Sequence, residues 1–263
     1  MEAKETITLT SDFGLKDPYA AEMKGVILTI NPDSVIVDIT HDIEKFNIQM
    51  GAFTLASAAP YFPKGTVHLA VVDPGVGTKR RAIIIQTKQA YFVGPDNGLL
   101  ILAAENQEIT HTYQLTNQKF MLPETSSTFH GRDIFAPAAA YIEKGIKPEK
   151  LGPEIFDPVK PEFAQIKHEN DSIIGRVLDV DSFGNIITNI NKSAITKNSE
   201  VINVKILNCQ LKLRLKKTYG ETKPNEPLAL IGSHGFLEIA LNRGSAAKKY
   251  QATVGMEIAV SPA

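Results

Sequence analysis

The chain has 263 residues, of which 43% are hydrophobic and 22% charged, and its formal net charge is −1. This length allows one large domain or two smaller ones, each with its own core. The near-zero net charge argues against an electrostatic nucleic-acid binder, which carries a clustered basic excess. No apolar run reaches the roughly 18 residues of a membrane span, and residues 1–11 lack a signal-peptide pattern. Cys209, as a single cysteine, excludes an internal disulfide framework and a multi-cysteine zinc site. We expect a cytoplasmic globular protein.

In residues 1–157, short β-rich runs alternate with helical patterns. The expected strands are Thr6–Thr10, Val35–Ile39, Val67–Val72, Ala82–Gln86 and Tyr91–Val93. The expected helices are Tyr19–Ile30, Asn47–Ala58 and Arg132–Lys144. This alternation predicts an α/β domain with a mostly parallel central sheet.

The second part of the chain has a different pattern. Residues 158–170 are proline-containing and then polar, which is typical of a linker. Over residues 171–263, turn clusters separate short apolar runs, which predicts a small all-β barrel or sandwich. The expected strands are Ile173–Val180, Ile186–Ile190, Val201–Leu207, Leu211–Leu215, Leu228–Ile231, Leu237–Leu241 and Met256–Val260.

Polar or glycine-bearing turns follow several of the expected strands in the first domain. They are Ser11–Gly14, Thr40–Asp42, Asp73–Gly77 and Gly94–Gly98. Each of them alone is an ordinary turn sequence. In a parallel α/β sheet, however, ligands bind beyond the carboxyl ends of the strands. Several such turns at one edge therefore predict a binding site.

Three familiar patterns in these turns are weak. Asp12-Phe13-Gly14 matches the metal-binding triplet of kinases without the other kinase motifs, and Gly75–Lys79 lacks the order of a phosphate loop. A metal hydrolase is an alternative, because aspartate and histidine ligate metals, but no spacing fixes a ligand pair on one element. The candidate ligands would be Asp12, His41, Asp42, Asp73 and His130.

The segment Thr125–Pro137 has an unusual residue order, with His130 directly before an expected helix start. His130 is either an ordinary surface-loop residue or, in the functional interpretation, faces the carboxylate of Asp73 together with the backbone N–H groups at this start. The neighbouring Arg132 and Asp133 are consistent with a simple ion pair, since aspartate suits a first helical turn.

Seven motifs, in order along nearly the whole chain, resemble those of the S-adenosyl-L-methionine (SAM) hydroxide adenosyltransferases, or SAM hydrolases. These enzymes are relatives of the fluorinating and chlorinating SAM enzymes. The resemblance implies an α/β N-terminal domain, a β-barrel-like C-terminal domain and a homotrimer. It also implies that SAM lies between the N-terminal domain of one subunit and the C-terminal domain of the next. The motifs are TSDFG at 10–14, DITHDI at 38–43, VVDPGVGTKRR at 71–81, GPDNGLL at 94–100, TFHGRDIFAPAAA at 128–140, DSFGNIITNI at 181–190 and GSHGFLEIALNRGSAA at 232–247.

The resemblance implies a catalytic triad of Asp73, Arg80 and His130. The halogenases carry tyrosine at the aspartate position and no histidine at the histidine position. The halide-binding serine of the fluorinating relative matches Gly131, so a halide nucleophile is the less favoured alternative.

The resemblance also implies contacts to SAM. Asp12 matches the carboxylate that accepts hydrogen bonds from both ribose hydroxyls, which suits its two acceptor oxygens, and Phe46 matches an aromatic residue over the ribose. His234 departs from the arginine that the halogenases have. The expected adenine-reading residues are Asn185, Leu241 and Arg243, and those expected at the methionine end are Asp181, Ser233 and Glu238.

The expected reaction is displacement at C5′ of SAM by water or hydroxide, which gives adenosine and L-methionine. We expect no cofactor, because SAM is itself the substrate, and no metal, because no ligand spacing indicates one. We expect the homotrimer to bind SAM, adenosine and L-methionine and neither nucleic acid nor membrane. Two alternatives remain: a halide-using adenosyl transferase, and a SAM- or adenosine-binding protein without turnover.

Overall fold

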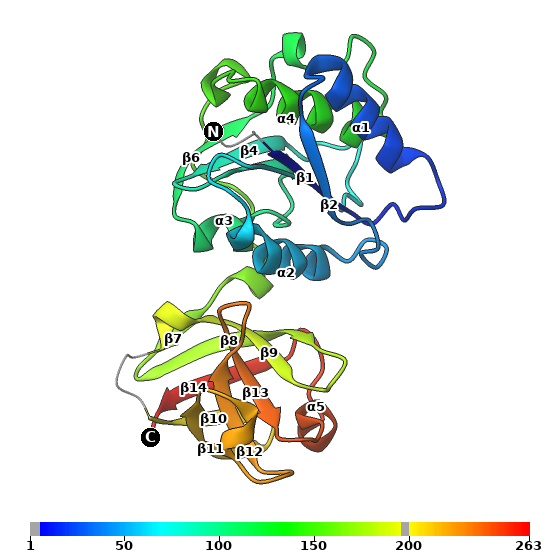
Figure 1. Cartoon of the computed structure of the whole chain (residues 1–263). Coiled ribbons are helices and arrows are strands. Elements are labelled where there is room, and N and C mark those ends of the chain that lie inside the picture. Colours follow the sequence, from blue (N-terminus) through cyan, green and yellow to red (C-terminus); the bar gives the residue numbers. More distant parts are fainter. Residues whose placement is uncertain (1–5, 196–199) are drawn as a thin grey trace. The chain divides into compact units, whose positions relative to one another are not determined.

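The structure is a computed structural model that describes residues 6–195 and 200–263 (Figure 1). It divides into two compact units, with the division between Lys160 and Pro161. The segment expected to be a linker, residues 158–170, spans this division, and its role as a linker stays a prediction. Within the second unit it contributes a 3-10 turn at Glu162–Ala164 and the short strand β7 at Lys167–Glu169.

The first unit contains a six-stranded sheet in the order β2-β1-β3-β5-β4-β6. The three pairs formed by β1, β2, β3 and β5 are parallel, whereas β4 pairs antiparallel with both β5 and β6. The prediction of a mostly parallel sheet was therefore wrong, and the sheet is mixed. The strands are β1 (Thr6–Ser11), β2 (Val35–Thr40), β3 (Val67–Val71), β4 (Ala82–Thr87), β5 (Tyr91–Pro95) and β6 (Ile109–Gln114).

The length of the β4–β5 connection explains this difference. Only residues 88–90 join the two strands. A parallel pair needs a crossover of a dozen or more residues, whereas an antiparallel pair needs only a tight turn. The Thr87 hydroxyl accepts a hydrogen bond from the Ala90 N–H at 2.9 Å and closes this turn.

Helices cover both faces of the sheet (Figure 1). On one face, α1 packs on α4, and Met23 and Ile27 of α1 join the core with Leu9 of β1. On the other face, α2 packs on α3. The predicted helix over 132–144 is a π-helical turn at Gly131–Phe135 that continues into α4. The helices are α1 (Tyr19–Ile30), α2 (Ile48–Ala58), α3 (Ile101–Asn106) and α4 (Ala136–Glu143).

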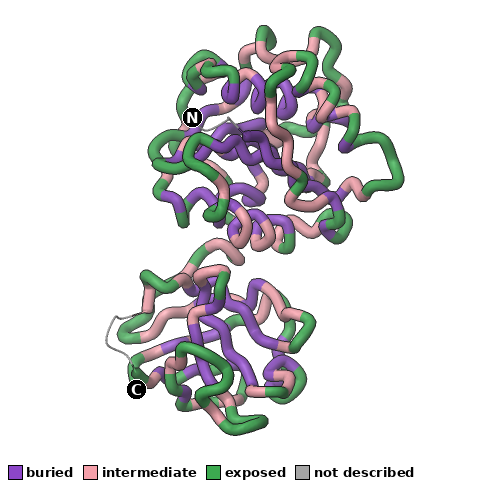
Figure 2. Tube along the Cα trace, in the orientation of Figure 1, coloured by how far each residue is buried: buried purple, intermediate pink, exposed green. Residues whose placement is uncertain are grey.

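The second unit is a closed seven-stranded barrel, as the β-rich pattern predicted. Its strands follow the order β14-β10-β11-β12-β13-β9-β8, and the β8–β14 pairing closes it. Figure 2 shows that buried residues concentrate in the strands of both units. The short helix α5 is Ala246–Tyr250. The strands are β8 (Ser172–Val180), β9 (Ile186–Asn191), β10 (Val201–Ile206), β11 (Cys209–Lys216), β12 (Pro227–Ile231), β13 (Phe236–Leu241) and β14 (Glu257–Pro262).

One barrel connection matters for the site. β11 and β12 pair parallel, so the chain between them cannot be a simple hairpin. This connection lies along β13: the Asn225 N–H donates to the Asn242 carbonyl at 2.7 Å, and the Asn242 side chain donates to the Thr222 carbonyl at 2.6 Å. It carries a 3-10 turn at Tyr219–Glu221.

His68 is a fully buried histidine in the core of the first unit. Its Nδ1 lies 2.7 Å from the Thr8 hydroxyl, and its ring stacks on Phe92 with the centroids 4.9 Å apart. Burial lowers the pKa of His68 from 6.5 to about 4. The folded state therefore keeps this ring neutral at pH values where the unfolded chain takes up a proton.

We predict that His68 makes the protein less stable in acid. Above pH 6.5 the ring is neutral in both states, so its contribution to stability is fully present there. As the pH falls from 6.5 to 4, only the unfolded state is protonated, and about 3 kcal/mol of the free energy of unfolding is lost. Urea unfolding at several pH values measures this loss. In His68→Gln that part of the pH dependence should vanish; an unchanged slope would contradict the assignment.

Candidate active site

A pocket of about 440 Å³ lies at the edge of the first unit where β1 and β3 end. Two of the predicted polar turns, Ser11–Gly14 and Asp73–Gly77, contribute to its wall. The third, Thr40–Asp42, does not line the pocket, and the segment after β2 contributes Lys45 and Phe46 instead. The fourth predicted turn, Gly94–Gly98, does not line it. There the Asp96 carboxylate instead accepts a hydrogen bond from Arg81 Nε at 2.7 Å. The lining residues are Asp12, Phe13, Asp17, Tyr19, Lys45, Phe46, Val71, Asp73, Val76, Thr128, Phe129, His130 and Gly131.

The three residues expected to form a triad meet at this pocket. Arg80 donates from Nε to Asp73 Oδ1 at 3.1 Å and from Nη2 to Asp73 Oδ2 at 2.5 Å, which is a bidentate pair. Arg80 Nη2 also lies 3.0 Å from His130 Nδ1. The side chains of Arg80 and Asp73 are only 8% and 4% exposed. Asp73 and His130 line the pocket, and Arg80 holds both of them.

Glycine at position 77 allows the two segments of the triad to approach. Gly77 has a φ of +74°, and a Cβ built on it would lie 2.3 Å from the Ser127 carbonyl oxygen. A side chain at this position would therefore push away the segment that leads to His130. The turn itself is closed by the Thr78 hydroxyl, which donates to the Gly75 carbonyl at 2.7 Å.

An ion-pair network fixes the segment before His130. The fully buried Asp133 carboxylate accepts hydrogen bonds from the Ser126 N–H at 2.8 Å and from Arg132 Nε at 2.7 Å. Arg132 Nη1 also donates to Glu22 at 2.8 Å. Arg132 and Asp133 thus form the ion pair that the sequence suggested, and this pair holds the His130 loop on helix α1.

The protonation state of His130 follows from its neighbours. A guanidinium group can only donate, so Nδ1 of His130 accepts from Arg80 and the proton of the neutral ring is on Nε2. Burial lowers the pKa of His130, and the positive charge of Arg80 lowers it further, against the opposite effects of Asp73 and Asp133. His130 is therefore a neutral donor through Nε2 at neutral pH.

Asp12 and Phe46, the residues expected at the ribose, lie in the same pocket. Asp12 is 6% exposed, and its Oδ2 accepts a hydrogen bond from the Phe46 N–H at 2.9 Å. Phe46 has a φ of +65°, which is unfavourable for a bulky residue and is typical of functional sites. Its side chain is 67% exposed. The same pocket holds an aromatic cluster that was not predicted from the sequence, formed by Phe13, Tyr19 and Phe129 with ring centroids 5.1–5.7 Å apart.

A second pocket, of about 700 Å³, lies on the barrel unit. Asp181 shapes one side of it by accepting hydrogen bonds from the N–H groups of Phe183 and Asn185 at 2.9 and 2.8 Å. The Asn185 side chain donates to the other carboxylate oxygen at 2.9 Å. Four predicted substrate-binding residues line this pocket: Asp181, Asn185, Leu241 and Arg243.

Ser233 and Glu238, also expected at the substrate, are not among the residues that line this pocket. Ser233 is exposed in the turn between β12 and β13. Glu238 is 3% exposed; its Oε1 accepts from the Tyr219 hydroxyl at 2.6 Å, and its Oε2 lies 3.4 Å from His234 Nε2. Tyr219 does line the pocket. Sequence analysis missed it, although it is an aromatic residue within a polar turn cluster.

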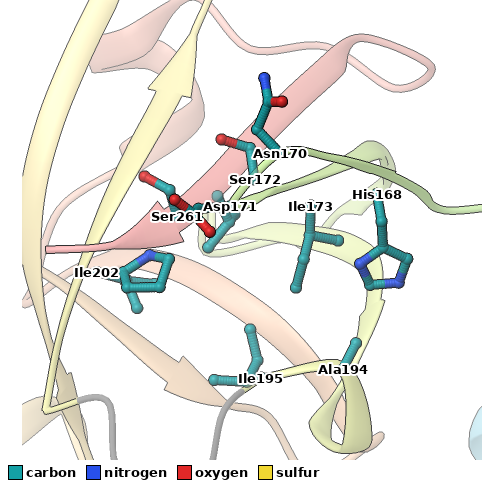
Figure 3. Close-up of a pocket in the computed structure, with 11 residues that line it drawn as sticks. His168, Asn170, Asp171, Ser172, Ile173, Ala194, Ile195, Ile202 and Ser261 are labelled. Carbon is teal, nitrogen blue, oxygen red and sulfur yellow. The ribbon is translucent and has the colours of Figure 1, made fainter.

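A smaller hollow of about 170 Å³ lies elsewhere on the barrel, at the β7–β8 turn and β14. Figure 3 shows His168, Asn170 and Asp171 at this hollow, and all three are exposed. Within residues 6–195 and 200–263, no group of three or more His, Cys, Asp or Glu side chains is placed to hold a metal ion. In the same part of the chain, no helix has the length and apolarity needed to cross a bilayer.

Comparisons with known proteins agree with the motifs. The N-terminal domain model of the SAM hydroxide adenosyltransferases matches residues 7–152, and the C-terminal domain model matches residues 175–259. The (R)-S-adenosyl-L-methionine hydrolase of Methanocaldococcus jannaschii is 41% identical over 257 residues, which cover 93% of this chain and 91% of the relative.

A more distant relative and a solved structure are also similar to this chain over nearly its whole length. The fluorinase of Actinoplanes sp. is 27% identical over 297 residues, which cover 98% of this chain and 97% of the fluorinase. A crystal structure of an uncharacterized conserved protein from Thermotoga maritima has a TM-score of 0.81 and 38% identity, covering 97% of this chain and 99% of that one. Both domain models match in order and a relative above 40% identity spans nearly the whole chain, so this chain belongs to the SAM hydroxide adenosyltransferase family.

Proposed function

We propose that this protein hydrolyses S-adenosyl-L-methionine to adenosine and L-methionine. The observation that carries the proposal is the contact of Asp73, Arg80 and His130 at a pocket that also holds Asp12. The relative from Methanocaldococcus jannaschii is named for the (R) form of the substrate. We therefore propose the (R)-sulfonium epimer as the preferred substrate.

The proposed step is a direct displacement. The oxygen of a water molecule attacks C5′, the C5′–sulfur bond breaks, and its electron pair goes to sulfur, so that methionine leaves as a neutral thioether. No general acid is needed at the sulfur. The water loses one proton, and within the triad we assign its acceptance to Asp73, because the guanidinium of Arg80 has no acceptor atom and the one acceptor nitrogen of His130, Nδ1, already accepts from Arg80.

Arg80 and His130 have complementary parts in this step. The guanidinium lies directly behind Asp73 and His130 and supplies positive charge where the oxygen becomes anionic. His130 Nε2–H donates to the attacking oxygen. Fixed orientation of water against C5′ contributes further to the rate, since well-aligned reacting pairs gain up to about 7–11 kcal/mol.

The remaining predicted residues are assigned to binding. Asp12 accepts from the ribose hydroxyls, and Phe46 packs on the sugar. On the barrel unit, the proposed adenine contacts are Asn185, Leu241 and Arg243, and the proposed methionine contact within the pocket is Asp181. Ser233 and Glu238, which do not line the pocket, are proposed at the methionine end from the family resemblance alone, and Glu238 would have to exchange its contacts with Tyr219 and His234. The family resemblance supports a homotrimer in which the two pockets of one site come from different subunits.

Gly131 argues against a halide nucleophile. It matches the halide-binding serine of the fluorinating relatives, and a Cβ built on it would lie 3.1 Å from Met23 Sδ and from the Phe129 ring. These contacts are tighter than ordinary packing, so a serine here would require its neighbours to shift. This supports water rather than a halide as the proposed nucleophile.

We predict that the purified protein converts SAM to adenosine and methionine, as measured by liquid chromatography of reactions with the separated (R) and (S) epimers. Added chelator should leave the rate unchanged, and added chloride or fluoride should give no halogenated nucleoside. Alanine at Asp73, Arg80 or His130 should lower kcat by on the order of 10²–10⁴, because each change removes a group that acts in the transition state.

The same variants supply the control, because adenosine binding should remain measurable in all three. Unchanged turnover in all three variants would overturn the triad assignment. Loss of turnover in chelator would favour a metal hydrolase. Adenosine binding without turnover in the wild type would place the protein among nucleoside-binding proteins.

The trimer has its own test. Sedimentation equilibrium should give a mass of three chains of 28.7 kDa. A mass of one chain would contradict both the trimer and the shared site.

A further inference from the structure

The turns that follow β1 and β2 are joined by several hydrogen bonds. Backbone groups join them twice: the Gly14 N–H donates to the His41 carbonyl at 2.7 Å, and the Ile43 N–H donates to the Ser11 carbonyl at 3.3 Å. Asp12 joins them twice more, through its carboxylate to the Phe46 N–H at 2.9 Å and through its carbonyl to Lys45 Nζ. The position of Asp12 thus depends on the second turn.

The His41 side chain adds a further link, and it is the buried one. His41 is 3% exposed, and its Nδ1 lies 2.7 Å from the hydroxyl of Ser11, the residue directly before Asp12. Its Nε2 lies 3.2 Å from Asp38 Oδ1. Asp38 Oδ2 in turn accepts from Lys24 Nζ at 2.6 Å. Close polar contacts therefore lead from Lys24 on helix α1, through Asp38 and His41, to the strand end that presents Asp12.

The order Ser–His–Asp resembles a hydrolytic triad, but the burial of its serine excludes that function. Ser11 is fully buried, and its Oγ already accepts from the Phe13 N–H at 3.3 Å. A nucleophile must reach its substrate, and this hydroxyl is enclosed. What the hydroxyl does instead is fix the backbone of the turn on both sides of Asp12.

Asp38 is suited to anchor this chain. Burial raises the pKa of Asp38, but hydrogen bonds from Lys24 and His41 outweigh burial and leave that pKa below its ordinary value. Asp38 is therefore an anion that holds the His41 ring from the side opposite to Ser11.

We propose that His41, anchored by Asp38 and Lys24, is a positioning residue that sets the Asp12 carboxylate for the ribose hydroxyls of the substrate. The inference rests on the proposed function, because it takes the ligand to be a nucleoside. Asp12 touches the ribose and not the reacting bond, so the network supports binding of substrate and transition state alike. Its loss then raises KM and leaves kcat nearly unchanged.

A double-mutant cycle tests this proposal. The variants are His41→Gln, Asp12→Asn and the two combined, and the readouts are kcat and KM for SAM and the Kd for adenosine by calorimetry. We expect His41→Gln to raise KM and the adenosine Kd about tenfold, the size of one lost hydrogen bond, with kcat within about twofold. In the Asp12→Asn background the same change should have no further effect, because His41 acts through Asp12.

The matched control is His68→Gln, since His68 is also buried and also bonded to a hydroxyl of β1, at Thr8, away from the pocket. This control should lower the melting temperature without changing the adenosine Kd. If His41→Gln does not fold, Asp38→Ala replaces it, because Asp38 is 35% exposed and its loss removes the same anchor.

The outcomes separate the inference from the proposed function. Three results would each overturn the positioning role. The first is a His41→Gln protein with wild-type KM and adenosine Kd. The second is an effect of His41→Gln that adds to that of Asp12→Asn, and the third is a lower kcat of His41→Gln at unchanged KM. Wild-type protein that neither turns over SAM nor binds adenosine would overturn the proposed function itself.

Discussion

The buried pair of Asp73 and Arg80 is the interaction on which the site depends. Burying two charges is costly unless further hydrogen bonds satisfy them. Arg80 meets this requirement: besides its two bonds to Asp73, it donates to the Arg81 carbonyl at 3.0 Å and contacts His130, and its guanidinium carbon lies 5.3 Å from the centre of the Phe135 ring. Its orientation is therefore fixed, and with it the orientation and proton position of His130.

The rest of the first unit brings three chain segments to this pair. Strands β1 and β3 end at the pocket and place Asp12 and Asp73, while the π-helical turn before α4 places His130. Gly77 has no side chain, and a side chain there would collide with Ser127 in the segment that leads to His130. Each of these features lies within a turn, where chemistry can vary while the sheet and helices stay constant. The strands and helices thus hold short, hydrogen-bonded turns, and these turns carry the residues of the site.

Much of this was predictable from the sequence. Buried apolar runs predicted most strands of both units, and two of the four predicted polar turns, Ser11–Gly14 and Asp73–Gly77, line the pocket. The direction of strand pairing was predicted less well, because the short connection 88–90 forces β4 and β5 to pair antiparallel. Strand β6 was not predicted, because its polar, partly exposed residues lack the pattern of a buried strand. Gly94–Gly98 has the composition of a ligand turn, but Arg81 occupies its carboxylate.

Side-chain partners on the barrel could not be predicted, because they depend on pairings between distant segments. Glu238 lies in strand β13, and its carboxylate accepts a hydrogen bond from the hydroxyl of Tyr219, nineteen positions earlier in the connection between β11 and β12. The hydrophobic pattern of the sequence does not reveal such a contact. Sequence motifs identified the family, whereas the contacts of buried polar residues such as His41 emerged only from the geometry.

The central claim is that water oxygen attacks C5′ of SAM, and isotope labelling tests it most directly. Turnover in ¹⁸O-enriched water, followed by mass spectrometry of both products, should place one ¹⁸O atom in the 5′-hydroxyl of adenosine and none in methionine. Unlabelled adenosine would show that the oxygen added to C5′ does not come from water, and label in a fragment derived from the methionine chain would show that a different bond is broken. Either result would contradict the account.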